Sequence, residues 1–479
     1  MLSFRLARQR LLSTVALVVV FAAPSLRAQD STTTERFVGT WKGVLELPGS
    51  VLRLALDITR SGDAVGGSLT SLDQSNTKIP VALIVRNDSL VADMPSIVAS
   101  FAVALQSDTL RGLFTQNGTT GRITLAHLSH TIVAVVARRP QEAVGVIPYD
   151  TADVSFPSVS GVVLAGTLTT PRGTGPWPAV VLVSGSGPQD RDERVMGHRP
   201  FFVLADYLTR RGIAVLRYDD RGTGRSTGDF AAGTTADFAD DAGAAVRFLG
   251  GRLEVDRQRI GVVGHSEGGL IAPMLAARSS NVAFVVLMAA PGVRGDSLLV
   301  LQNQALLRTS GVPPVEAEPL GRLTSRLLHA VSSSHDSLDA RSRLLDIEDQ
   351  YVAAQLPDRQ EPMRRTLTGR NGQLLTPWMR YYLAYDPSAV LARVTVPVLA
   401  VNGTLDVQVI CRPNLDAIST ALRAAGNTDF EAVALSGLNH LFQTAETGAV
   451  SEYSLIEETM SPTALQRVGD WIQRHTQKR

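Results

Sequence analysis

The sequence predicts an antiparallel β barrel or sandwich, followed by an α/β domain with a mostly parallel sheet and a helical insertion. Three observations support this fold class. Apolar residues alternate with a period of two from about residue 36 to residue 139, which is typical of half-buried strands. Apolar runs then alternate with helical patterns, as in a parallel sheet covered on both faces. Within this second part, a serine between two glycines stands between a strand and a helix.

Composition indicates an ordinary globular protein without an affinity for nucleic acid. The 479 residues are enough for two domains, and 44% are hydrophobic while 19% are charged. The formal net charge is +1, but Arg5, Arg8, Arg10 and Arg27 all lie in the first 28 residues. Without that segment the net charge is near −3, so no basic face is expected to bind phosphates, and no nucleic-acid partner is expected.

Residues 1–28 are predicted to be a secretory signal peptide. A basic segment (1–10) precedes an apolar one (11–23), and a small residue, Ala28, marks the expected cleavage site. No later apolar run has transmembrane length, so we expect no stable membrane span after signal removal, and a periplasmic or secreted location. Cys411 is the only cysteine, which excludes an intrachain disulfide. We expect it to be a small packed side chain.

Residues 29–140 are expected to form the β domain. Leu52 to Ile58 alternate with polar or small residues, and Asn117-Gly118 is one of several turn signals. The opening Gly39-Thr40-Trp41 looks like the first strand of lipocalin-like barrels. A rigid accessory module without a ligand is the alternative. A linker follows at 139–148, where Pro140 and Pro148 limit regular structure.

Ser266 is the predicted nucleophile of the second domain. An apolar run from Ile260 ends at Gly264, Ser266 lies midway between Gly264 and Gly268, and a helical pattern begins at Leu270. A serine on so sharp a turn has strained backbone angles, and the small neighbours let other chain segments pass close to it. The turn therefore presents the hydroxyl at the carboxyl edge of a sheet. A chance match in a chain with 40 glycines is the alternative.

The other catalytic partners are expected later in the chain, in the order acid and then histidine. The apolar run 396–401 leads to Asp406, which follows the strand end directly. The last predicted strand, 430–435, is followed by His440. We expect Asp406 to orient His440, and His440 to accept the proton of Ser266. The alternatives are a helix N-cap for Asp406 and a surface-loop histidine for His440. His265 adjoins the nucleophile but is expected to point elsewhere.

Two glycine-rich loops lack the complete motifs of nucleotide-binding sites. Ser184 to Pro188 has no third glycine, and Gly222 to Ser226 does not end in Gly-Lys-Ser/Thr. The first loop follows the strand before the first helix, so the backbone N–H groups of Ser186 and Glu267 are the expected oxyanion hole. For the loop from Ser184 to Pro188, the alternative is a simple Gly-Pro turn without a catalytic role. This chemistry requires no metal and no organic cofactor.

A helical cap is predicted at about residues 292–390. Ser266 and Asp406 lie 140 positions apart, which is more than one helix and one strand occupy. Helical spacing recurs at 298–307, 316–328, 338–356 and 378–384. Aromatic residues gather near the end of this insertion and are candidates for the pocket wall. They are Trp378, Tyr381, Tyr382 and Tyr385, together with Met379.

From about Val154 to His475 the chain resembles the α/β-hydrolase superfamily, and within it bacterial hydrolases near the serine aminopeptidase-like (S33) group. One departure is Ser184-Gly185, where many relatives begin the oxyanion loop with His-Gly. The resemblance implies a hydrolase domain at 141–479 and carboxylesterase-type activity in secreted or periplasmic proteins that often have a β-rich N-terminal module. It rests on the segments 184–192, 218–226, 264–269, 403–406 and 439–440.

The predicted function is therefore a serine hydrolase that cleaves small carboxylic esters through an acyl-enzyme. An S33-type aminopeptidase is one alternative, and it would need a cap carboxylate for the ammonium group of its substrate. A ligand-binding protein on an inactive hydrolase fold is another, although the complete ordered set of Ser266, Asp406 and His440 argues against it. The cap offers five candidate carboxylates, namely Glu316, Glu318, Glu348, Asp349 and Glu361.

Overall fold

The structure is a computed structural model. It describes residues 35–47, 50–61, 64–72, 78–86, 88–94, 99–116, 119–127, 139–143, 145–309, 314–355 and 357–477. The predicted signal peptide, 1–28, lies outside the described residues. None of the helices in these ranges is both long enough and apolar enough to span a bilayer.

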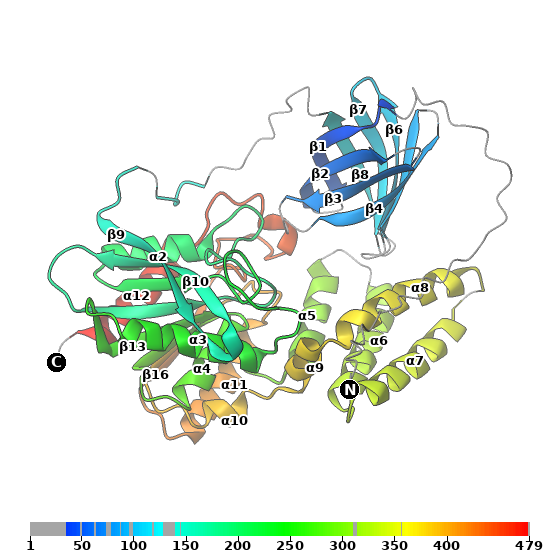
Figure 1. The fold of residues 1–479 in the computed structure, drawn as a ribbon. Coiled ribbons are helices and arrows are strands. Elements are labelled where there is room, and N and C mark those ends of the chain that lie inside the picture. Colours follow the sequence, from blue (N-terminus) through cyan, green and yellow to red (C-terminus); the bar gives the residue numbers. More distant parts are fainter. Residues whose placement is uncertain are drawn as a thin grey trace, which may run out of the picture.

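The N-terminal part is a closed eight-stranded antiparallel barrel, drawn in blue in Figure 1. Each strand pairs with the next along the chain, and the last pairs with the first. Closure removes the exposed edges of a sheet, and it shows that the predicted β domain is a barrel rather than a sandwich. The strands are β1 (Gly39–Leu47), β2 (Ser50–Ser61), β3 (Ala64–Ser71), β4 (Ile79–Arg86), β5 (Ser89–Met94), β6 (Ala99–Gln106), β7 (Thr109–Gln116) and β8 (Thr119–His127).

Large side chains fill the inside of this barrel. Trp41, Leu56 and Phe101 are almost completely buried, and the Trp41 indole N–H donates to the Phe37 carbonyl at 2.8 Å. Strand pairing is close at Gly43, where a Cβ atom would lie 1.9 Å from a backbone oxygen of β8. A barrel of eight strands is just wide enough to be filled in this way.

The second part is an eight-stranded sheet in the order β16-β15-β14-β13-β11-β12-β10-β9. Pairing is parallel from β12 to β16, and β9 and β10 join antiparallel. This confirms the predicted α/β-hydrolase fold. The strands are β9 (Tyr149–Pro157), β10 (Val163–Pro171), β11 (Trp177–Val183), β12 (Ala214–Tyr218), β13 (Val255–His265), β14 (Phe284–Met288), β15 (Val398–Gly403) and β16 (Phe430–Leu435).

Helices cover both faces of this sheet, and successive strand residues pack on opposite sides. In β11, Val181 belongs to one apolar cluster and Val180 to the other, as the alternation of a strand requires. The first cluster includes α3 (Thr235–Gly250), α4 (Gly268–Ala276) and α11 (Cys411–Ala424), and the second includes α2 (Pro200–Arg210) and α12 (Pro462–Thr476). Cys411 is buried in the first cluster, and burial raises the pKa of its thiol to about 11, so it is a packed side chain.

The cap is inserted between β14 and β15, and it gathers on one side of the sheet (Figure 1). It has its own apolar core around Leu327, Leu344 and Leu383. Helix α8 was not predicted, because its sequence is mostly polar and has few apolar residues to mark a period. The helices are α5 (Gly295–Thr309), α6 (Pro314–Ser332), α7 (Ser337–Ala353), α8 (Pro357–Leu374) and α9 (Pro377–Ala384), and the short α10 (Ser388–Leu391) leads back to the sheet.

The linker after the barrel is bonded to loops of the α/β domain. The Arg139 guanidinium donates to the carbonyls of Gly197 at 3.1 Å and Ile456 at 2.9 Å. The Gln141 amide donates to the Met460 carbonyl at 2.6 Å and accepts from the Met460 N–H at 3.0 Å. Arg139 and Gln141 therefore bind the linker to the α/β domain, and strand β2 of the barrel also contacts the segment Val450–Glu452.

Removing residues 29–138 is expected to leave a folded protein that still hydrolyses small esters. The proposed catalytic groups all lie beyond Tyr149, and this truncation retains Arg139 and Gln141 with their contacts. A shorter protein that begins at Gly145 lacks these contacts and should have a lower Tm. Turnover of a short ester and the Tm of both truncations test this expectation. Loss of activity in a folded 139–479 protein would instead show that the barrel shapes the site.

Candidate active site

Ser266 lies on the turn between β13 and α4, with a φ angle of 52°. This left-handed conformation is costly for a residue with a Cβ atom. The flanking glycines are explained by close packing, because a Cβ atom at Gly264 would lie 2.0 Å from the Gly268 carbonyl oxygen. One at Gly268 would lie 2.1 Å from the Val183 carbonyl oxygen. The Ser266 N–H donates to the Met288 carbonyl at 2.8 Å, which ties the turn to β14.

The structure brings Asp406 and His440 together at the ends of β15 and β16. His440 Nδ1 donates to Asp406 Oδ2 at 2.8 Å, and both side chains are buried. The other carboxylate oxygen, Oδ1, accepts from the backbone N–H groups of Gln408 at 2.8 Å and Val409 at 2.9 Å. The N-cap alternative does not apply, because α11 begins only at Cys411. The remaining imidazole nitrogen, Nε2, is left for a proton transfer.

Ser266 and His440 line one cavity of about 330 Å³. Both residues are described, and no hydrogen bond joins the Ser266 hydroxyl to the imidazole. In free enzymes such contacts are often long and shorten when the substrate binds. Three of the five predicted pocket residues, Trp378, Met379 and Tyr382, are in the cavity wall. Tyr381 and Tyr385 are not in it, and instead stack on each other at 5.8 Å.

The predicted oxyanion donors are the N–H groups of Ser186 and Glu267. Within the described part of the chain, neither N–H donates a hydrogen bond. Ser186 lines the cavity, and the adjacent Gly185 is so close to the nucleophile that a Cβ atom there would lie 3.1 Å from Ser266 Cβ. N–H groups beside the serine are the geometry that stabilises a developing oxyanion. The unusual Ser184 hydroxyl is directed elsewhere and donates to Asp220 at 3.0 Å.

The side chain of Glu267 joins the turn to the cap. Its buried carboxylate accepts from Thr235 Oγ1 at 2.6 Å and from Trp378 Nε1 at 2.8 Å. Burial raises the pKa of this carboxyl, and the hydrogen bonds from Thr235 and Trp378 oppose that rise. Since Trp378 is also in the cavity wall, Glu267 fixes one side of the pocket as well as offering its N–H.

Glu193 is a buried residue of the site that the sequence did not reveal. Its Oε1 atom accepts from the Gly185 N–H at 2.7 Å and from His265 Nδ1 at 2.9 Å. The other ring nitrogen of His265 contacts the His440 carbonyl at 3.0 Å. Burial lowers the pKa of His265, but the Glu193 carboxylate and the His440 carbonyl outweigh this and raise it. Both partners are acceptors, so a doubly protonated His265 ring can donate to each of them, and it links the loop at Gly185 to His440.

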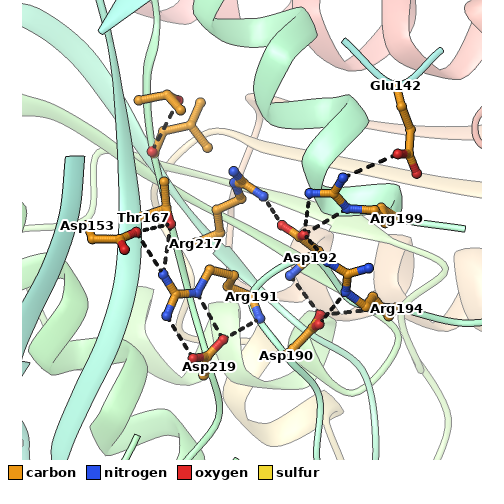
Figure 2. Close-up of polar contacts among 12 residues, drawn as sticks. Glu142, Asp153, Thr167, Asp190, Arg191, Asp192, Arg194, Arg199, Arg217 and Asp219 are labelled. Carbon is orange, nitrogen blue, oxygen red and sulfur yellow. Dashed lines mark hydrogen bonds and ion pairs between the residues drawn. The ribbon is translucent and has the colours of Figure 1, made fainter. Parts of the chain in front are cut away.

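Ion pairs hold the loop that carries Ser186 and Glu193 (Figure 2). Asp192 pairs with Arg217 of β12 and, at 2.7 Å, with Arg199 at the start of α2. Arg191 pairs with Asp219 at 2.8 Å. These carboxylates are nearly inaccessible to solvent, so the loss of one partner would leave an uncompensated buried charge. The acid-rich stretch after the oxyanion loop is therefore part of its support.

Stability is expected to fall as the pH decreases from about 6.5 towards 4. Burial and the nearby charge of Arg139 lower the pKa of His198 to about 4. Between about pH 6.5 and pH 4, His198 is therefore protonated in the unfolded chain but neutral in the folded protein. Proton binding thus favours the unfolded state in this range. Urea unfolding at several pH values should show a weaker pH dependence in His198→Asn than in the wild type. Equal slopes in both proteins would contradict the assignment.

Comparison with known proteins assigns the chain to a family. The sequence model of the X-Pro dipeptidyl-peptidase (S15) family matches residues 160–435, which is more than half of the chain. The chain belongs to the S15 family. The matched range includes Ser186, Ser266 and Asp406 and ends at the last residue of β16. The S15 protein is thus a hydrolase of the α/β fold, and the narrower S33 relationship stays a prediction.

Esterase EstD of Thermotoga maritima is 28% identical to the S15 protein over 284 residues. The alignment spans 59% of each chain, which is less than two thirds of the relative's length. An esterase of Pyrococcus furiosus is 16% identical, with 73% of this chain and all of that one covered, at a TM-score of 0.41. The α/β hydrolase GrgF of Penicillium is 20% identical, with 68% and 99% covered, at a TM-score of 0.42.

Proposed function

We propose that this protein is a secreted or periplasmic serine esterase that cleaves uncharged carboxylic esters through an acyl-enzyme on Ser266. The observation that carries the proposal is the arrangement around one cavity. Ser266 lies on a strained turn, and His440 is held by the buried Asp406. Two N–H groups, those of Ser186 and Glu267, have no partner in the described part of the chain. The esterase relative from Thermotoga supports the choice of reaction.

The reaction follows from these positions. As Ser266 Oγ bonds to the acyl carbon, its proton passes to His440 Nε2, and the carbonyl oxygen takes up negative charge beside the two N–H groups. Asp406 holds the imidazole with its Nδ1 protonated and stabilises the imidazolium. The bond from the acyl carbon to the alcohol oxygen then breaks, and the alcohol leaves with the proton from His440. Water repeats the sequence on the acyl-enzyme and releases the acid.

The cap carboxylates do not favour an aminopeptidase. Glu318 pairs with Arg322 and Asp349 with Arg364 on the exposed surface of the cap. Glu348 is buried inside the cap and accepts a hydrogen bond from the Asn371 amide at 3.0 Å. Neither these three carboxylates nor Glu361 lines the cavity of Ser266, and the side chain of Glu316 lies outside the described residues. Surface ion pairs of this kind contribute little energy, and none of the three is placed to bind an ammonium group.

X-Pro dipeptidyl peptidase activity is the second candidate, and the S15 family match favours it. A peptide amine would need a carboxylate near the serine. The wall formed by the described residues has one, Glu193, and its Oε1 atom already accepts from Gly185 and His265. The second oxygen, Oε2, has no hydrogen-bond partner among the described residues, but it is buried, so a substrate amine would have to displace the side chains that cover it. An uncharged ester does not need a carboxylate near the serine.

Short aryl esters are therefore expected to be better substrates than dipeptidyl Xaa-Pro anilides. An ester needs only the nucleophile and the oxyanion donors, whereas an amide also needs a well-placed proton donor for a poor leaving group. The measurement is kcat/KM for p-nitrophenyl acetate and for Ala-Pro-p-nitroanilide on the same preparation, with Ser266→Ala as the background control. A higher kcat/KM for the anilide, abolished by Glu193→Gln in a folded protein, would make the peptidase assignment correct.

A further inference from the structure

The cap contains a second cavity, of about 210 Å³, between α5, α6, α8 and α9. Its described walls are mixed. The apolar side chains include Leu306 from α5, Leu328 from α6 and Leu374 from α8, and the polar ones are Gln302, Asn303, Thr324 and Gln373. None of the described residues that line it is charged. A cavity with this lining suits an uncharged and mainly apolar group.

This second cavity adjoins the cavity of Ser266. Leu299, Gln302 and Met379 belong to the walls of both. Leu299 and Gln302 are on α5 and Met379 is on α9, so the wall that the two cavities share is formed by these two cap helices. A ligand attached to Ser266 can therefore continue into the cap without crossing the backbone of the sheet domain.

One wall position carries a polar atom whose hydrogen-bonding capacity is unused. The amide oxygen of Asn303 is buried and has no hydrogen-bond partner among the described residues. A buried acceptor in this condition costs free energy unless a ligand or a water molecule donates to it. Thr324, which is also buried, lines the same cavity from α6. The wall of the cavity thus holds a buried acceptor whose hydrogen-bonding capacity is unused.

We propose that the second cavity is the distal acyl subsite of the enzyme, on the premise that Ser266 forms an acyl-enzyme. It takes the far end of a mainly apolar acyl chain that carries a hydroxyl or amide N–H for Asn303. We assign the second cavity to the acyl part of the ester and not to the alcohol part, because the alcohol must stay close to His440, which donates a proton to it as it leaves. The wall beside that residue includes Leu441 and Tyr453, and neither lines the second cavity.

The test compares p-nitrophenyl esters from acetate to decanoate on the wild type and on Leu306→Trp, which fills the second cavity. In the wild type, kcat/KM should rise with chain length once the chain enters the cavity, by at most about three- to fourfold per methylene. Leu306→Trp should remove this rise and leave acetate hydrolysis unchanged. Gln304→Trp, on the exposed side of α5, is the matched control. If the first variant does not fold, Thr324→Leu fills the same cavity from α6.

The role of Asn303 is tested with p-nitrophenyl octanoate and its ω-hydroxy derivative. The wild type should prefer the hydroxylated ester, and Asn303→Leu should reverse that preference. If the wild type hydrolyses p-nitrophenyl acetate but its kcat/KM does not change with acyl chain length, the proposed subsite is wrong. It is also wrong if Leu306→Trp changes kcat/KM only when the alcohol part of alkyl acetates is lengthened. A wild type that hydrolyses no ester at all would instead refute the proposed function, so the two failures are distinguishable.

Discussion

Replacing Ser266 with alanine should reduce ester turnover by roughly 10⁴-fold or more, because no other group can form the acyl-enzyme. The protein should stay folded, since the hydroxyl makes no hydrogen bond among the described residues and the side chain lies at a cavity wall. Alanine has the same Cβ atom as serine and is no more strained at a φ of 52°. The measurement is kcat/KM for p-nitrophenyl acetate, with the Tm as a measure of folding.

The matched control for this variant is Ser280→Ala, which changes an exposed serine that is not among the residues lining the cavity. It should keep wild-type turnover. Near-normal turnover in a folded Ser266→Ala protein would mean that another residue is the nucleophile, and the proposed reaction would be wrong.

Asp406→Asn should reduce turnover about as severely, by roughly 10⁴-fold. The backbone N–H groups of Gln408 and Val409 donate to one carboxylate oxygen, so they would hold the amide oxygen of asparagine on that side. The amide nitrogen would then face His440 Nδ1, where it can only donate. The imidazole would therefore be protonated on Nε2 and would be unable to accept the serine proton. The kcat of the folded variant on p-nitrophenyl acetate measures this effect.

Asp416→Asn, on the exposed side of α11, is the matched control and should be as active as the wild type. Wild-type activity in Asp406→Asn would show that a different carboxylate orients His440. Asp406 would then serve only to bind the turn formed by Gln408 and Val409.

The fold was largely predictable, because strand and helix periodicities are local properties of the sequence. The turn at Ser266 and the strand ends before Asp406 and His440 followed from apolar runs and glycine spacing. A barrel and a sandwich share a period of two, so only the pairing of β1 with β8 distinguishes them. Helix α8 was missed because Leu367 and Leu374, which it buries, are too few to mark a helical period.

The support of the site was not predictable, since it depends on contacts between distant segments. Glu193 and His265 are 72 positions apart, and Arg139 reaches a carbonyl 317 positions away. No local pattern marks such partners. The run of acidic and basic residues after the oxyanion loop was a usable signal, because so many charges beside a buried strand must be paired. The second cavity also depends on how four cap helices pack, which the periodicity of each helix alone does not determine.

The most direct test of the proposal is to trap the acyl-enzyme. The wild type is mixed with excess p-nitrophenyl butyrate, quenched in acid within the first turnovers, digested and analysed by mass spectrometry, with Ser266→Ala treated in parallel. We predict a butyryl group on Ser266 in the wild type, and none on the corresponding peptide of the variant. Continued ester turnover with no acyl group on Ser266, or with the group on another residue, would contradict the account.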